Sequence, residues 1–177
     1  MYRVIGFIFT IVFAGLLSGC NPCNIIGKCP PYKPPPSPPP CGEIVDKLKL
    51  YGVQVIQVGD TLRIILPTDD YFRGTSTTEL QPGRAPYLYK IATLLQCGCY
   101  EGYPVHVNGY TDEVGTPNQR RARARQRAQT IAAYLWADGI PLQRMQVAGY
   151  GAADALSSNE TVVGSSNNRR VEITMPR

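Results

Sequence analysis

Two charged residues, Asp112 and Arg127, have the types and the spacing of a binding site for an ionic group. Asp112 follows a short apolar run that we expect to be a strand, and Arg127 lies fifteen residues further on, inside an expected helix. A carboxylate accepts hydrogen bonds from an ammonium group, and a guanidinium binds a carboxylate through two parallel hydrogen bonds. The pair therefore either binds a ligand that carries both charges or forms an ion pair with itself. Neither side chain is expected in the apolar core.

The helix that carries Arg127 has clear signals at both ends and is predicted from Thr116 to Asp138. Thr116 and Gln119 form a T-x-x-Q capping box, Pro117 occupies the first turn, and Gly139 ends the helix. Its buried face is predicted from apolar residues at helical spacing, namely Ala124, Ala128, Ile131 and Leu135.

Further apolar runs predict a small sheet around this helix. Val53 to Ile56 and Leu62 to Leu66 flank Gly59-Asp60, which is typical of a β-hairpin. We also expect a helix over 86–96 and strands at 105–108, 143–148 and 170–174. The order is β-hairpin, helix, strand, helix, strand, strand. This order predicts an α+β domain over residues 43–177, with a mixed sheet and two main helices on one face.

Residues 1–19 have the features of a secretory signal. Arg3 precedes an apolar run from Val4 to Leu17, which is shorter than the roughly 20 residues that span a bilayer. The sequence Leu17-Ser18-Gly19-Cys20 resembles a bacterial lipobox, which implies a covalent lipid on Cys20 and no other cofactor. By the same resemblance Asn21 favours the outer membrane, with the protein anchored at its periplasmic face.

The stretch 20–42 is predicted to be a lipidated cysteine followed by a linker. Eight of the eleven residues from Pro30 to Pro40 are prolines, which is typical of a semi-rigid polyproline II spacer. The formal net charge of +5 favours anionic surroundings such as a cell wall or lipid headgroups.

The cysteines indicate an oxidising compartment. Five remain after Cys20 is lipidated, so at most two internal disulfides form and one thiol is left over. We expect one bond between Cys41 and the Cys97-Gly98-Cys99 region. The ligand spacing is poor for zinc, and the single histidine argues against a Ser-His-Asp enzyme, so we predict no metal and no catalysis.

Four short motifs, in order, resemble the OmpA-like peptidoglycan-associated domain, and the resemblance spans residues 53–175. They are Leu66-Pro67 with Phe72; Asn108-Gly109-Tyr110-Thr111-Asp112 with Gly115; Arg127-Ala128 with Tyr134-Leu135 and Gly139; and Gly149-Tyr150-Gly151 with Asn168-Arg169-Arg170-Val171-Glu172-Ile173.

The resemblance implies a protein that binds peptidoglycan without cutting it and ties the outer membrane to the wall. Asp112 would bind the ammonium group of diaminopimelate in the stem peptide, and Arg127 its carboxylate. The further site residues implied are Thr111, Gly115, Asn168 and Arg169.

The run from Gln119 to Arg127 departs from the family because it holds five arginines. They form either a solvated helix face or a docking patch for a protein partner or glycan; export argues against nucleic acid. With the cysteine-rich start and the proline spacer, the run is similar to OmpA-like lipoproteins of Dot/Icm-type type IV secretion systems. A structural subunit of such an envelope machine is therefore the alternative function.

Overall fold

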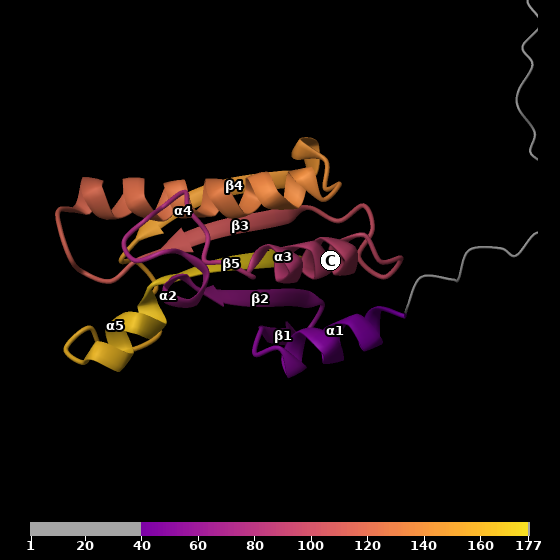
Figure 1. Cartoon of the computed structure of the whole chain (residues 1–177), viewed down its shortest axis with the longest axis horizontal. Helices are drawn as coiled ribbons and strands as arrows, with labels where there is room; N and C mark the ends of the chain where they lie inside the picture. The colour runs from indigo at the N-terminus through magenta and orange to yellow at the C-terminus, as the bar shows by residue number, and fades with distance from the viewer. Residues whose placement is uncertain (1–39, 177) are drawn as a thin grey trace, which may run out of the picture. The chain divides into compact units, whose positions relative to one another are not determined.

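The chain forms an α+β domain around one five-stranded sheet, as predicted (Figure 1). The computed structural model describes residues 40–176. The strands are β1 (Gln54–Val58), β2 (Thr61–Pro67), β3 (Val105–Tyr110), β4 (Met145–Gly151) and β5 (Arg170–Met175). Their order in the sheet is β1-β2-β5-β3-β4. β3 and β4 are parallel, and the other neighbours are antiparallel. The predicted hairpin, β1 and β2, turns at Gly59-Asp60.

Three longer helices lie on one face of this sheet (Figure 1). They are α1 (Cys41–Leu50), α3 (Ala85–Leu95) and α4 (Pro117–Ala137). The short helices α2 (Thr68–Tyr71) and α5 (Val162–Asn168) lie at one end of the sheet, and a 3₁₀ turn, η2 (Leu142–Arg144), precedes β4. The predictions anticipated α3 and α4 and missed α1, α2 and α5.

The predicted capping box at the N-terminus of α4 is present in the structure. The Thr116 side chain accepts a hydrogen bond from the Gln119 backbone amide, and the Gln119 side chain accepts one from the Thr116 amide. These two bonds satisfy amide groups that no helical carbonyl can reach. The four predicted apolar residues of the helix are all buried against the sheet and α3: Ala124, Ala128, Ile131 and Leu135.

A disulfide joins Cys41, the first residue of α1, to Cys97, just beyond α3. The expectation that Cys41 bonds to the 97–99 region is confirmed. The bond closes a separation of 56 residues, and such cross-links stabilise folds by typically about 2–4 kcal/mol. α1 begins at Cys41, within the stretch 20–42 assigned to the linker.

The predicted signal segment, Cys20 and the proline-rich stretch lie outside the described residues. Within residues 40–176, no helix has the length and apolar character needed to cross a bilayer.

Candidate functional site

The predicted charged residues meet at one end of the sheet, where β2 and β3 end and β5 begins (Figure 1). Because β5 lies between β2 and β3 and runs antiparallel to both, its first residues fall between the last residues of those two strands. Arg169 precedes β5, Asp69 follows β2 and Asp112 follows β3. The sheet topology therefore brings together residues that are far apart in sequence.

Asp112 is buried and forms an ion pair with Arg169, whose Nη1 lies 2.8 Å from Asp112 Oδ2. The same guanidinium donates from Nε to Asp69 Oδ1 at 2.9 Å. Hydrogen bonds to Asp69 and Asp112 raise the pKa of Arg169. The hydrogen bond from Arg169 lowers the pKa of Asp69. Both shifts favour the charged forms of Arg169 and Asp69. Two carboxylates share one guanidinium, so this side of the site carries a net negative charge.

Arg127 does not pair with Asp112, which excludes the alternative in which the two residues neutralise each other. Its Nη1 donates to Thr68 Oγ1 at 3.0 Å, and its Nε to the Ser76 carbonyl at 3.4 Å. The guanidinium also lies over the Phe72 ring, 5.6 Å from its centre. Burial and the neighbouring charge of Arg123 lower the pKa of Arg127. This cation has neutral hydrogen-bond partners and no carboxylate at salt-bridge distance among residues 40–176.

The expectation that Asp112 and Arg127 lie outside the core was wrong. Asp112 is 6% exposed and Arg127 is 4% exposed. Arg127 is three residues after Ala124 and four before Ile131, so it lies on the same side of α4 as the apolar stripe.

A cavity of about 800 Å³ opens between the negative and the positive groups. Asp69, Asp112 and Arg169 line its negative side, and Arg123 and Arg127 supply two further positive charges. The remaining lining residues are Gly74, Thr75, Gln81 and Val114. The cavity thus presents an anionic and a cationic region, which is the arrangement that a zwitterion requires.

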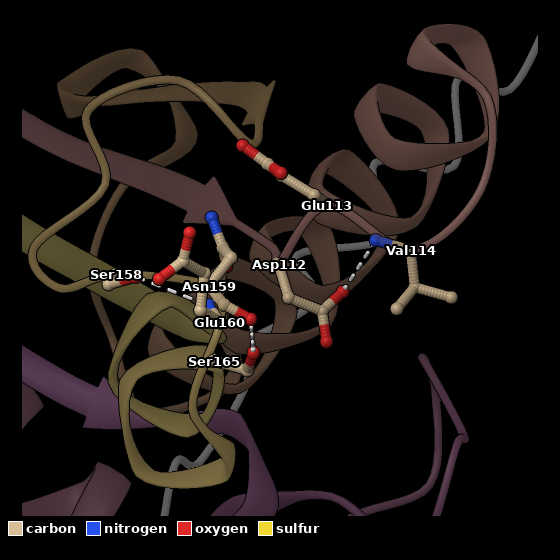
Figure 2. Close-up of a pocket in the computed structure, with 7 residues that line it drawn as sticks. All are labelled: Asp112, Glu113, Val114, Ser158, Asn159, Glu160 and Ser165. Atoms are coloured by element: carbon tan, nitrogen blue, oxygen red, sulfur yellow. Dashed lines mark hydrogen bonds between the residues drawn. The ribbon is translucent and has the colours of Figure 1, made fainter.

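A second cavity, of about 440 Å³, shares Asp112 and Val114 with the first (Figure 2). Figure 2 shows Asp112 and Glu113 pointing to opposite sides, although both residues line this cavity. The other residues that line it are Ser158, Asn159, Glu160 and Ser165. Among residues 40–176, no cluster of His, Cys, Asp and Glu has the geometry of a metal site.

Three predicted site residues position the cavity rather than line it. Thr111 donates through its amide to the Gly151 carbonyl and through its hydroxyl to the Asp112 carbonyl. Gly115 has a φ of +95°, which allows the tight turn before the capping box. Asn168 uses its side-chain amide to bind Leu156, Ser157 and Asn159, and so holds the loop before α5.

The sequence reasoning missed two charged residues that line the 800 Å³ cavity, Asp69 and Arg123, and its four uncharged lining residues. Asp69 had a usable signal, because it follows a predicted strand end just as Asp112 does. Arg123 was noted only as a member of the arginine run, which is not one solvated face. Arg121 and Arg125 are exposed, Arg120 and Arg123 are half-buried, and Arg127 is buried.

Known proteins resemble the chain over most of the described domain. It is 35% identical over 130 residues to the probable lipoprotein YiaD of Escherichia coli strain K12, covering 73% of this chain and 58% of YiaD. It is 28% identical over 155 residues to the peptidoglycan-binding protein ArfA of Mycobacterium tuberculosis strain H37Rv, covering 88% of this chain and 42% of ArfA. The chain thus spans about half the length of these relatives.

Among solved structures, the cell wall anchor of the T6SS from Pseudomonas aeruginosa superposes with a TM-score of 0.65 and 25% identity, over 78% of this chain and 96% of that one. The model of the OmpA family matches residues 71–169, a segment that runs from the end of α2 to the start of β5 and contains Asp112, Arg127 and Arg169. With the fold, the motifs and this match in agreement, the chain belongs to the OmpA family.

Proposed function

We propose that the domain binds peptidoglycan without catalysis, through the zwitterionic end of diaminopimelate in the stem peptide. The observation that carries the proposal is the charge separation in the 800 Å³ cavity. Two carboxylates that share Arg169 lie on one side, and the buried Arg127, which has no acidic partner among the described residues, lies on the other. The printed name of the relative ArfA, a peptidoglycan-binding protein, supports the same ligand.

The ligand's ammonium group would bind at Asp112, because Arg169 neutralises only one of the two charges of Asp69 and Asp112. The ligand's carboxylate would bind at Arg127 and would supply its counter-charge. This ion pair would stabilise the complex because a buried charge without a partner is unfavourable. A guanidinium that already donates to Thr68 and Ser76 is held in a fixed orientation, so less side-chain entropy is lost on binding.

Purified sacculi should retain the protein, and the tripeptide alanyl-γ-glutamyl-diaminopimelate should release it more effectively than alanyl-γ-glutamyl-lysine. The lysine peptide is a matched control because its α-amine is in the peptide bond, so it keeps the side-chain ammonium and has no carboxylate on the same carbon. Since a hydrogen bond to a charged group contributes about 1.5–3 kcal/mol, the diaminopimelate peptide should compete at a concentration roughly ten times lower or less. Equal competition by the two peptides in the pull-down would exclude a zwitterion site.

We further propose that a lipid on Cys20 anchors the protein to the outer membrane, on the basis of the sequence Leu17-Ser18-Gly19-Cys20. Cys20→Ala should prevent incorporation of labelled palmitate and move the protein from the membrane fraction to the soluble periplasm. Cys99→Ala is the matched control and should leave both unchanged. Continued flotation of the Cys20→Ala protein with outer membrane would contradict the anchor.

A second candidate function is that of a wall-binding subunit in a larger envelope machine, such as a secretion system. The likeness to the T6SS cell wall anchor favours it. The proposed similarity to Dot/Icm-type lipoproteins rests partly on residues 20–39, which lie outside the described part of the chain. Co-purification with a megadalton envelope complex, after mild detergent extraction, distinguishes this role from that of a free anchor.

A further inference from the structure

The first two turns of α4 contain two arginines, Arg120 and Arg121, that the diaminopimelate site does not use. Together with Tyr150, Gly151 and Glu113 they line a separate cavity of about 230 Å³. Neither arginine has an acidic partner at salt-bridge distance within residues 40–176. The charged groups of the lining are two guanidiniums and one carboxylate, so the cavity carries a net positive charge.

Arg120 is half-buried in the wall of this cavity, and one of its hydrogen-bond donors is unsatisfied. Its Nε is buried and has no hydrogen-bond partner, the only such side-chain atom within the described domain. Buried donors are almost always paired, and an exception calls for a ligand or another explanation. An oxyanion bound to this guanidinium would neutralise its charge, and a small rotation of the side chain would offer Nε as well.

The other walls of the cavity are packed against neighbouring groups of the fold. The Tyr150 ring stacks on Tyr110 with ring centres 5.4 Å apart, and Arg170 lies over the Tyr110 ring at 4.0 Å. Gly151 lies against the helix so closely that a Cβ there would meet the Arg121 amide nitrogen at 3.2 Å. The cavity is therefore formed by the fold itself, with a phenol hydroxyl and two guanidiniums as donors.

Shared wall residues place this cavity next to the 440 Å³ cavity, which in turn adjoins the diaminopimelate site. Glu113 lines both it and the 440 Å³ cavity, and Asp112 lines both that cavity and the 800 Å³ one. A ligand that extends from the first site past residues 112–113 would reach Arg120 and Arg121.

We propose that Arg120, Arg121 and Tyr150 form a second subsite, which binds another carboxylate of the same stem peptide. The choice of a stem peptide as the ligand rests on the proposed peptidoglycan function. The choice of a carboxylate rests on the two guanidiniums, which have no acidic partner within residues 40–176. The carboxylate to which we assign the subsite is the α-carboxylate of the glutamate that precedes diaminopimelate, which the γ-linked peptide bond leaves free. The subsite would distinguish peptides in which this group is free from peptides in which it is amidated.

The test measures, with the full chain, the affinity for the tripeptide alanyl-γ-glutamyl-diaminopimelate and for its α-amidated form. Amidation should weaken binding to the unaltered protein about three- to tenfold. Arg120→Gln and Arg121→Gln should each weaken binding of the acid peptide by a similar factor, and the effect of amidation should shrink in both. Arg125→Gln is the matched control, since it removes the same charge from an exposed position of the same helix. An equal loss in Arg125→Gln, or an undiminished amidation effect in both variants, overturns the subsite.

Two further arms separate the possible failures. If the unaltered protein binds neither peptide, the proposed function fails. The anion subsite is then tested separately, by an acetate titration in which the NMR resonance of Arg120 Nε–Hε is followed. A shift that Tyr150→Phe weakens supports an anion site, whereas an unmoved resonance overturns it. If vesicles of phosphatidylglycerol bind in a manner that Arg121→Gln abolishes and Arg125→Gln does not, while amidation has no effect, the anion is a lipid phosphate and the stem-peptide assignment is overturned.

Discussion

Arg127→Ala is expected to reduce sacculus binding about ten- to a hundredfold, because it removes the guanidinium that would hold the ligand's carboxylate. The same change should lower stability. Thr68 Oγ1 and the Ser76 carbonyl lose a donor, and Phe72 loses a packing partner. We expect a fall of about 1–3 kcal/mol in the free energy of unfolding. Binding must therefore be measured well below the melting temperature of the variant, with circular dichroism as the check on folding.

Asp112→Asn keeps the shape of the side chain and removes its charge. The asparagine keeps an oxygen for the Val114 amide, which Asp112 Oδ1 accepts at 3.3 Å, and Arg169 keeps its ion pair with Asp69, but an NH2 group replaces the oxygen that accepts from Arg169 Nη1. We expect binding to fall at least tenfold and the free energy of unfolding to fall by about 1–3 kcal/mol, so binding is measured on the folded protein. Unaltered binding by a folded Asp112→Asn protein would show that the ammonium group is bound elsewhere.

The control for both variants is Arg125→Ala, an exposed member of the same arginine run. It removes one positive charge from α4 and lines none of the cavities described above. Arg121 is less suitable, because it lines the cavity that contains Tyr150. If Arg125→Ala weakens binding as much as Arg127→Ala, the sacculus is held by diffuse charge attraction and the specific site is not present.

Local sequence signals were sufficient to predict α4 and the hairpin. A capping box, an apolar stripe and a Gly-Asp turn act within a few residues, and the fold did not override them. α5 carried no comparable signal, since its sequence is Val162-Val163-Gly164-Ser165-Ser166-Asn167-Asn168. It is held by the Thr161 cap and by the contacts of Asn168 with the preceding loop.

The partners of the site residues could not be derived from local signals. Arg169 bridges Asp69 and Asp112 because β5 inserts between β2 and β3, and this strand order is a long-range property. The burial of Arg127, in contrast, was open to prediction. The spacing of Ala124, Arg127 and Ile131 places the arginine on the apolar side of α4, and its charge was given more weight than its position.

The distance between α4 and the sheet sets the geometry of the site, and Gly109 controls that distance. A Cβ at Gly109 would lie 2.0 Å from the carbonyl oxygen of Ala124, far inside van der Waals contact. Gly149 on β4 makes a similar approach, with a Cβ position 2.4 Å from the Arg125 amide nitrogen. The motifs Gly109-Tyr110-Thr111-Asp112 and Gly149-Tyr150-Gly151 thus contain glycine because helix backbone occupies the space of a side chain.

Gly109→Ala is therefore expected to cost about 3 kcal/mol or more, since the clash is with backbone that no rotamer change can relieve. Either the domain unfolds, or α4 moves away from β3 and carries Arg127 away from Thr68 and the cavity, so ligand binding is lost in both cases. Urea unfolding and sacculus pull-down measure the two effects. Gly42→Ala is the matched control: no atom lies within 4 Å of its Cβ position, and alanine should stabilise α1 by up to about 1 kcal/mol. A Gly109→Ala protein that unfolds at the same urea concentration as the unaltered chain and still binds sacculi would show that this contact does not set the helix–sheet spacing.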